Sequence, residues 1–308
     1  MTSTPRPDGL RAQLAALTTE SIRPELADID RLPTAEIARI MNGEDRTVPT
    51  AVAAQLPAIA AAIDATAERM GRGGRLVYAG AGTAGRLGVL DASECPPTFN
   101  TAPGEVVGLI AGGPTAMVDA VEGAEDSKQL AAGDLDGLGI SAPDTVVGVS
   151  ASGRTPYAIG AVEHARAHGA LTIGLACNAD SALAAAAEHG IEIVTGPELL
   201  AGSTRLKAGT AQKLVLNMIS TITMIRLGKT YGNLMVDVRA SNDKLRARSR
   251  HIVALATGAR DDAIDAALEA ADGEVKTAIL MLLADLDAPA AADRLKGTNG
   301  RLREALLD

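Results

Sequence analysis

Residues 75–86 read RLVYAGAGTAGR, and residues 145–155 read TVVGVSASGRT. Each stretch begins as a short apolar strand, continues into glycine with serine or threonine, and then opens a helix. The first turn of such a helix points backbone N–H groups and the positive end of the helix dipole at one spot, which suits a phosphate. Glycine lets the anion approach the main chain, and the hydroxyls add donors. Two such turns predict one anionic, sugar-sized ligand that is held from two loops.

The alternation of strand and helix continues around these turns. The expected strands are residues 75–79, 106–111, 145–150, 171–176 and 191–195. Short apolar strands that alternate with helices indicate an α/β fold, with a parallel sheet covered by helices on both faces. Ligands bind such sheets beyond the carboxyl ends of the strands, where both turns fall. Residues 9–72 have helical periodicity, and residues 252–308 break into short amphipathic helices.

Composition narrows the class of protein. The 308 residues are 47% hydrophobic, with one Phe, three Tyr and no Trp, which argues against binding by ring stacking. A net charge of −9 opposes nucleic acid as a partner. Two distant cysteines imply no disulfide framework and a reducing compartment. We expect no signal peptide and no membrane span, since no run approaches ~20 apolar residues, and therefore a cytoplasmic location.

Residues 80–85 match the dinucleotide fingerprint G-x-G-x-x-G. A Rossmann site also needs an acidic residue at the end of the second strand, whereas Glu105 precedes its expected strand. We therefore expect no nicotinamide cofactor. For either loop by itself, a tight turn needed only for packing is the alternative.

The anion loops supply most of the candidate binding residues: Gly82, Thr83, Gly85, Arg86, Ser150, Ser152, Arg154 and Thr155. Ser203, Thr204 and Lys207 lie where a loop enters a long helix, and are candidates for a third contact to the anion. The alternative is that a serine or threonine there only caps the helix.

Two acidic segments are candidates for acid–base chemistry. Glu94 lies in LDASECPPT, beside apolar residues and two prolines. Partial desolvation there would favour the neutral carboxyl and suit a general acid; the alternative is a surface acid at a helix end. Glu122, Glu125 and Asp126 would share one face of a helix, and the alternative is an ordinary solvated face.

The histidines predict no metal site. His164 and His168 have the i, i+4 spacing of zinc-binding helices, but no acid accompanies them in the H-E-x-x-H manner. We expect them to be surface residues.

Several stretches resemble the N-acetylmuramic acid 6-phosphate etherase family. These are residues 80–88, 90–98, 121–126, 150–157, 207–218 and 232–238. The resemblance extends from about Thr18 to the end of the sequence. The segment around Glu94 is highly specific to this family. Ala84 departs from the serine that the family usually has, and residues 22–24 depart from an expected segment that contains asparagine.

The resemblance implies a sugar isomerase (SIS) fold and a carbon–oxygen lyase that works without metal or redox cofactor. It implies that the D-lactyl ether of N-acetylmuramic acid 6-phosphate is cleaved to N-acetylglucosamine 6-phosphate and D-lactate, in cell-wall amino-sugar recycling. Glu94 would protonate the departing lactate and later activate water, while Glu125 would take the C2 proton. The implied domains are an N-terminal helical segment (1–50), an SIS sugar-phosphate-binding domain (51–250) and a small three-helix domain that resembles a ubiquitin-associated domain (251–308).

Two alternatives remain on the same fold. One is a non-catalytic protein that senses sugar phosphates, like the related glucokinase regulatory protein. The other is an aldose–ketose isomerase, which shares the proton abstraction but does not explain the Glu94 segment.

The long helix expected at residues 207–227 is apolar on more than one face. Its apolar residues are Leu214, Leu216, Met218, Ile219, Ile222, Met224 and Ile225. Such a helix must be buried in a core or against a second chain. Because the family resemblance also implies a dimer, we expect a homodimer with this helix at or near the interface. The alternative is a helix wholly internal to one chain.

Overall fold

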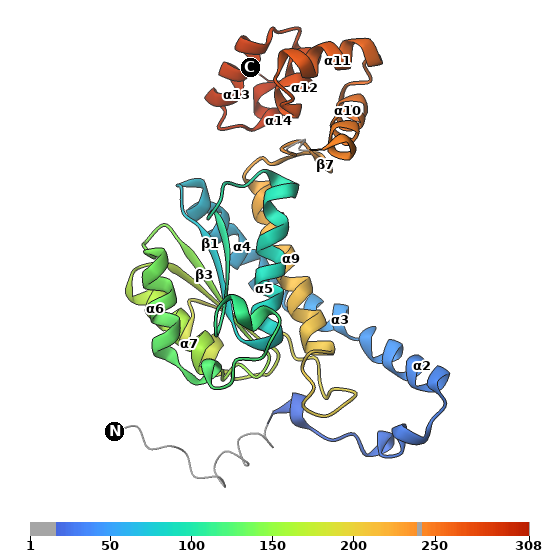
Figure 1. Cartoon of the computed structure of the whole chain (residues 1–308), viewed down its shortest axis with the longest axis vertical. Helices are drawn as coiled ribbons and strands as arrows, with labels where there is room; N and C mark the ends of the chain where they lie inside the picture. The colour runs from blue at the N-terminus through green and yellow to red at the C-terminus, as the bar shows by residue number, and fades with distance from the viewer. Residues whose placement is uncertain (1–16, 239–241, 308) are drawn as a thin grey trace. The chain divides into compact units, whose positions relative to one another are not determined.

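The computed structural model describes residues 17–238 and 242–307 (Figure 1). The part of the expected N-terminal helical segment that precedes residue 17 lies outside this range. The described residues fall into two compact units. Of the described residues, the first unit, here called the sheet unit, contains those up to Ser93 and Val107–Ile219. The second, the helical unit, contains Glu94–Val106 and those from Ser220 onward.

The N-terminal region is helical but interrupted. Its elements are η1 (Thr18–Glu20), η2 (Pro24–Leu26), η3 (Ile29–Arg31), α2 (Thr34–Asp45), α3 (Val48–Ala53) and α4 (Leu56–Gly71). The expected long helical stretch is therefore wrong before residue 34, where the chain forms short 3-10 turns. Pro24 and Pro33 contribute to this, because proline lacks an N–H group and keeps the residue before it extended.

A five-stranded sheet forms the centre of the sheet unit, with the order β2-β1-β3-β4-β5. Its strands are β1 (Leu76–Gly80), β2 (Val106–Ile110), β3 (Thr145–Ser150), β4 (Leu171–Ala176) and β5 (His189–Glu192). The pairs β1–β3, β3–β4 and β4–β5 are parallel. All five expected strands are confirmed, although the fifth begins earlier than expected. Every residue of β1, β3 and β4 is buried, as in a sheet covered on both faces.

Helices cover both faces of this sheet (Figure 1). They are α4, α5 (Gly82–Phe99), α6 (Lys128–Leu138), α7 (Pro156–Ala167), α8 (Ala182–Ala186) and α9 (Lys207–Arg226). Val77 and Val146 point to the face where α6 and α7 pack, in one apolar cluster with Leu135 and Ala161. The next residue of β1, Tyr78, points to the opposite face and lies against Gly88 of α5. This period of two lets β1 contribute to two cores.

A polar network also ties three elements of the sheet unit together. The buried carboxylate of Asp91 on α5 accepts hydrogen bonds from the Tyr78 hydroxyl (2.7 Å) and from Nδ2 of Asn217 on α9 (2.6 Å). Because a buried carboxylate is costly without donors, these contacts fix α5 and α9 on the sheet.

The helical unit has its own core. Its elements are β6 (Thr230–Tyr231), β7 (Leu234–Met235), α10 (Asp243–Thr257), α11 (Asp261–Ala270), α12 (Val275–Ala284), α13 (Ala288–Gly297) and α14 (Leu302–Ala305). Two short 3-10 turns, η4 (Pro114–Met117) and η5 (Ala124–Asp126), belong to the sheet unit. Ile279 and Leu280 of α12 are fully buried in a cluster that also includes Val253 and Ile264.

The helices of the described residues are short or polar compared with a membrane span. No single helix is long and apolar enough to cross a bilayer, although the bent pair Thr34–Ala53 and Leu56–Gly71 passes by length and composition together.

Candidate active site

The strand order determines where a ligand can bind. After β1 the chain crosses to β2 on one side, and after β3 it crosses to β4 on the other. The loops that follow β1 and β3 therefore diverge at the carboxyl edge of the sheet, which is where folds with this strand order bind ligands. These loops contain residues 81–85 and 150–155, so the structure brings the two predicted anion loops to one edge.

The first loop turns back tightly on β1. A Cβ on Gly85 would lie 2.6 Å from the carbonyl oxygen of Gly80, so only glycine fits there. Gly82 begins α5 with a φ of 54°, in the left-handed region. The first N–H groups of α5, including that of Thr83, therefore follow directly on the strand end, as a phosphate loop requires.

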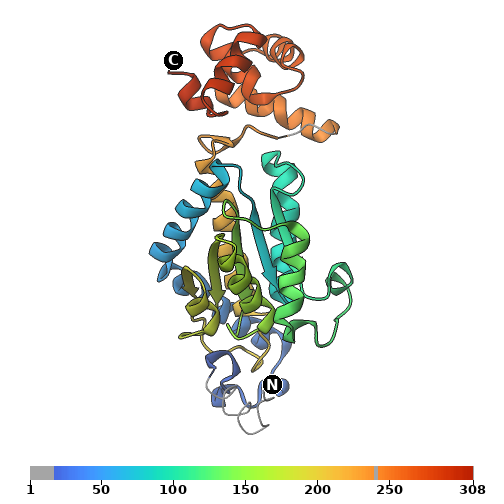
Figure 2. The same cartoon turned by 90° about the vertical axis from the view of Figure 1, so that its left-hand side faces the viewer.

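A cavity of about 150 Å³ lies beside this loop. Its lining joins Gly82 and Arg86 of α5 with Glu122 and Glu125 of the segment between β2 and α6. Figure 2 shows this segment in green, standing out from the rest of the sheet unit. Arg86 Nε donates to the carbonyl oxygen of Met117 at 3.0 Å and ties the segment to α5. The predicted acid Glu125 and the first anion loop thus line the same cavity.

The prediction that Glu122, Glu125 and Asp126 share one helical face is wrong. Glu122 lies in a turn, and Gly123 takes a φ of 75°, which ends any regular helix at that point. Only Glu125 and Asp126 lie on η5. All three carboxylates are exposed.

Ser150 is buried and holds the second loop together. Its Oγ lies 2.8 Å from Thr155 Oγ1 and 3.2 Å from Ser152 Oγ, and it accepts the N–H of Gly153 at 3.1 Å. The N–H of Arg154 donates to Ser152 Oγ at 3.2 Å. Ser152 and Thr155 are only half-buried, and Thr155 makes no side-chain cap to α7. A ligand can therefore reach hydroxyls that the buried Ser150 holds in place.

The start of α9 lies beside the first loop, but its N-terminus is already filled. A Cβ on Gly209 would lie 3.4 Å from Thr83 Cγ2. The buried carboxylate of Glu198 accepts the N–H groups of Lys207 and Ala208, both at 2.9 Å. A carboxylate at this position occupies the donors that a phosphate would need. Ser203 and Thr204 lie in the preceding loop and are half-buried.

Lys207 is held by a partner that is distant in sequence. Its Nζ donates to Oε2 of Glu44 on α2 at 2.9 Å, and only 5% of its side chain is exposed. Oε1 of Glu44 also pairs with Arg23 at 2.6 Å. Burial alone would raise the pKa of Glu44, but hydrogen bonds from Lys207 and Arg23 outweigh it and lower that pKa. Sequence reasoning missed Glu44 and Glu198, because no local spacing links either residue to Lys207.

Glu94 lies within α5 and is exposed. The expected partial desolvation is not found in the single chain, because Pro96 and Pro97 beside it are exposed as well and do not shield it. The structure assigns Glu94 to the helical unit and Glu125 to the sheet unit.

Comparison with known proteins places this chain in a family. Residues 58–166 match the glucokinase regulatory protein N-terminal SIS domain, and residues 129–222 match the SIS domain. The chain is 78% identical over 306 residues to the N-acetylmuramic acid 6-phosphate etherase of Streptomyces avermitilis, covering 99% of this chain and 98% of that protein. The chain belongs to the N-acetylmuramic acid 6-phosphate etherase family.

More distant members of the etherase family match over the same length. The etherase of Rubrobacter xylanophilus is 60% identical, covering 96% of this chain and 97% of that protein. The etherase of Escherichia coli O157:H7 is 54% identical, covering 96% and 99%. Among solved structures, a phosphoheptose isomerase from Francisella tularensis is 19% identical with a TM-score of 0.48, covering 63% of this chain and all of that one.

Of the two departures from the etherase pattern, Ala84 is packed inside the protein, whereas Ile22 of residues 22–24 is 79% exposed. Ala84, where the family resemblance led us to expect serine, is 7% exposed. Among the described residues, one group of three could hold a metal ion, and it includes none of the loop residues.

Proposed function

We propose that this chain cleaves the D-lactyl ether of N-acetylmuramic acid 6-phosphate and releases N-acetylglucosamine 6-phosphate and D-lactate. The observation that carries the proposal is the 78% identity to an etherase over nearly the whole length of both chains. The cavity beside the first anion loop, lined by Arg86 and Glu125, supports it independently. A cytoplasmic role in cell-wall amino-sugar recycling fits this substrate.

The reaction needs two acid–base groups. The ether at C3 is β to the C1 aldehyde of the open-chain sugar, so the C2 proton is acidic enough for a carboxylate to remove it. Lactate is a poor leaving group that must be protonated as the C3–O bond breaks. Water then adds to the C2–C3 double bond, with its proton returning to C2 and its hydroxyl going to C3. Elimination and hydration together consume one water and need no redox step.

Glu125 is the proposed base for the C2 proton, and Glu94 the proposed acid for lactate and base for water. Both carboxylates are exposed in the single chain, so substrate can reach them. The division of roles between them follows from the family resemblance.

The 6-phosphate is proposed to bind between the two loops at the carboxyl edge. The N–H groups of Gly82 and Thr83 would donate from the first loop, and the hydroxyls of Ser152 and Thr155 from the second. Gly85, whose N–H already donates to the carbonyl oxygen of Ala81 at 3.3 Å, would contribute by allowing the tight turn. Ser150 would take part mainly by fixing those hydroxyls, because its own Oγ already has three close contacts. Arg86 and Arg154 are proposed to supply positive charge near the phosphate. Lys207, whose charge Glu44 balances in the single chain, is proposed to hold the start of α9 beside the first loop. Ser203 and Thr204 would complete the pocket from the α9 side.

The chain is also proposed to act as a homodimer through α9. The exposed fractions of Ile222 and Ile225 are 38% and 45%, whereas Leu216 and Ile219 on the same helix are buried. A second copy is the proposed cover for these residues. Light scattering tests the assembly: a particle near the 31.3 kDa chain mass would overturn the dimer.

The chain is proposed to consist of an N-terminal helical segment (1–50), the SIS domain (51–250) and a C-terminal domain (251–308). The helices of the C-terminal domain are proposed to form the ubiquitin-associated-like fold.

A direct assay tests the function. Purified protein is incubated with N-acetylmuramic acid 6-phosphate, and D-lactate is measured with a D-lactate-specific enzyme. We expect turnover with the 6-phosphorylated sugar and none with the unphosphorylated sugar. Full activity in both Glu94→Gln and Glu125→Gln would overturn the assignment of the acid–base pair. The proposed substrate would not be affected by that result.

A sugar-phosphate sensor is the second candidate, favoured by the match of residues 58–166 to the glucokinase regulatory protein domain. Tight binding of the phosphorylated sugar with no release of lactate would favour the sensor and reject the enzyme.

A further inference from the structure

Helix α6, helix α7 and the C-cap residue of α7, His168, bring three metal-ligating side chains together. Nε2 of His164 lies 2.7 Å from Oδ1 of Asp136, and the ring of His168 lies 4.4 Å from the ring of His164 between centroids. One ligand atom from each of the three residues lies within 4.8 Å of the other two. The acid that sequence spacing did not supply therefore comes from another helix, 28 residues earlier in the chain.

The hydrogen bonding of His168 prepares it for a metal. Its Nδ1 lies 2.9 Å from the carbonyl oxygen of His164. A carbonyl oxygen only accepts hydrogen bonds, so Nδ1 carries the proton and Nε2 keeps its lone pair. Metal-bound histidines are held in this way, with one ring nitrogen donating to a carbonyl or carboxylate and the other free for the metal.

The two helices are fixed against each other independently of the three residues. The hydroxyl of Tyr157 on α7 donates to Asp134 on α6 at 2.6 Å. Leu135 of α6 and Ala161 of α7 are fully buried in the same apolar cluster. The backbones that carry the ligands are therefore fixed, and only side chains need to move.

We propose that Asp136, His164 and His168 bind one divalent transition-metal ion, with Zn²⁺ as the best fit. Zn²⁺ takes imidazole nitrogen and carboxylate oxygen at about 2.0–2.2 Å in a tetrahedron, which sets ligand atoms roughly 3.4 Å apart. Reaching that spacing requires shifts of about 1 Å. These are accessible because 63% of the Asp136 side chain and 20% of the His164 side chain are exposed. Coordination replaces the His164–Asp136 hydrogen bond, and water fills the fourth position.

The metal would clamp the carboxyl-terminal ends of two helices whose other ends meet the candidate active site. α6 starts two residues after η5, which carries Glu125, and α7 starts directly after the second anion loop. The site itself rests on geometry that is independent of the proposed function. The main consequence is stabilisation of the α6–α7 pair, because an ion that binds only the folded chain raises stability by mass action.

The test uses the full-length chain without a histidine tag. Calorimetric titration with Zn²⁺, and the visible absorption of Co²⁺ as a second probe, should each give one strong site per chain. Zn²⁺ at saturation should raise Tm by at least about 2 °C. Asp136→Asn, His164→Ala and His168→Ala should each weaken Zn²⁺ binding at least about tenfold. His251→Ala, an exposed histidine on α10, is the matched control and should bind Zn²⁺ like the unchanged chain.

Three outcomes would overturn the metal site as a whole, and a fourth would overturn its three-ligand set. They are the absence of a site with one ion per chain, binding that survives all three substitutions, and binding that His251→Ala weakens equally. Asp136→Asn that binds as tightly as the unchanged chain would reject the three-ligand site and leave only a histidine pair. Circular dichroism on each apo variant checks folding, and Asp136→Asn and His168→Ala change exposed side chains that should not disturb it.

Discussion

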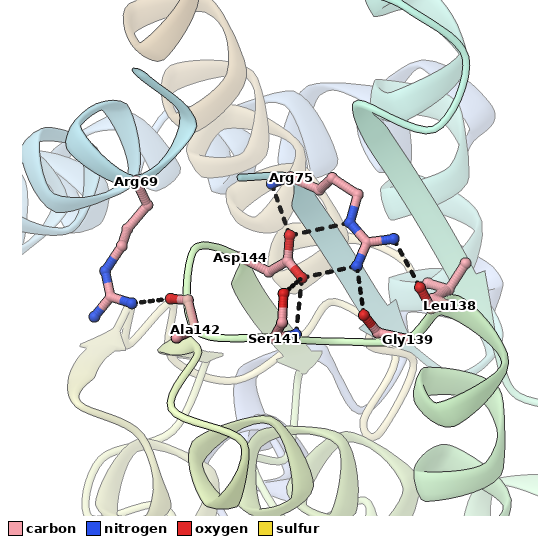
Figure 3. Close-up of polar contacts among 7 residues, drawn as sticks. All are labelled: Arg69, Arg75, Leu138, Gly139, Ser141, Ala142 and Asp144. Carbon is pink, nitrogen blue, oxygen red and sulfur yellow. Dashed lines mark hydrogen bonds and ion pairs between the residues drawn. The ribbon is translucent and has the colours of Figure 1, made fainter. Parts of the chain in front are cut away.

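The two edges of the same sheet use polar groups in opposite ways. At the carboxyl edge, the loops after β1 and β3 leave Ser152 and Thr155 half-buried and α7 without a side-chain cap. At the amino edge, where the same strands begin, the polar groups of Arg75 and Asp144 are bonded to each other or to the main chain (Figure 3). At the carboxyl edge the hydroxyls of Ser152 and Thr155 are therefore within reach of a ligand, whereas at the amino edge Arg75 and Asp144 are already bonded to protein groups.

The amino edge is built around the carboxylate of Asp144. Arg75 donates to it from its main chain and from its guanidinium, at 2.8 to 3.0 Å, and the N–H of Ser141 adds a further bond. The same guanidinium also donates to the carbonyl oxygens of Leu138 and Gly139 at the end of α6. Figure 3 shows Arg69 reaching the carbonyl oxygen of Ala142 on the same loop.

Burial alone would raise the pKa of Asp144, but the Arg75 guanidinium and the backbone N–H groups outweigh it and lower that pKa. The comparison therefore predicts that changes at the carboxyl edge alter activity, whereas changes at the amino edge alter stability.

The largest effect is expected for Glu125→Gln at the carboxyl edge. Removing an acid–base group typically lowers the rate by about 10² to 10⁴. The side chain is exposed, so Tm should stay unchanged. Steady-state release of D-lactate and thermal unfolding measure the two. Asp126→Asn, an exposed acid on the same 3-10 turn, is the control and should keep full activity; equal losses in both variants would show that the turn rather than the carboxylate matters.

The next effect is expected for Asp144→Asn at the amino edge. Removing one partner of a buried ion pair costs about 3 kcal/mol of unfolding free energy, while KM should not change. The pKa of Asp144 is lower in the folded chain than in the unfolded chain. The stability that its carboxylate contributes is therefore present above the ordinary aspartate pKa of roughly 4, and is lost as pH falls through the pKa of the folded chain. Urea unfolding at several pH values measures both.

The matched control is Glu163→Gln on α7, which breaks an exposed ion pair with Lys128 and should cost under about 1 kcal/mol. An Asp144→Asn variant as stable as this control, or one with a raised KM, would remove the distinction between the two edges.

The strands were predictable because their signal is local. Residues 145–150 and 171–176 are short apolar runs beside glycine, and a fully buried parallel strand needs no more. Both anion loops followed from the strand ends. The turn around Gly123 was not predictable in the same way, because charged residues at helical spacing do not reveal a left-handed glycine between them.

Contacts between distant segments could not be predicted at all. Glu44 meets Lys207 across 163 residues, and Asp136 meets His164 across 28. In the sequence alone, nothing distinguishes Glu44 or Asp136 from an ordinary surface acid. Only the packing of α2 near the start of α9, and of α6 against α7, gives these carboxylates their partners.

A smaller effect is expected for Ser152→Ala at the carboxyl edge, which is compared with Ser141→Ala at the amino edge. Losing a hydrogen bond to a charged phosphate typically costs ~1.5–3 kcal/mol, so KM for the phosphorylated sugar should rise roughly ten- to a hundred-fold. Ser141→Ala at the amino edge removes only a 3.3 Å contact to Asp144 and should leave KM unchanged. An unchanged KM in Ser152→Ala would reject this hydroxyl as a phosphate contact.

The smallest effect is expected for Glu44→Gln, which tests the ion pair between Glu44 and Lys207 at the start of α9. The Glu44 side chain is 20% exposed, whereas that of Asp144 is 3% exposed, so water can partly compensate the lost charge and we expect a loss of about 1 kcal/mol. The pKa of Glu44 is lowered, so its contribution is present above the ordinary glutamate pKa of roughly 4 and is lost in acid. The unchanged chain should therefore lose stability toward acid more steeply than Glu44→Gln does. Glu36→Gln, which removes an exposed partner of Arg39 on the same helix, is the matched control and should be neutral. If urea unfolding finds the two variants equally stable at neutral pH, Glu44 does not hold Lys207 in the folded chain, and this part of the carboxyl edge is as open as the anion loops.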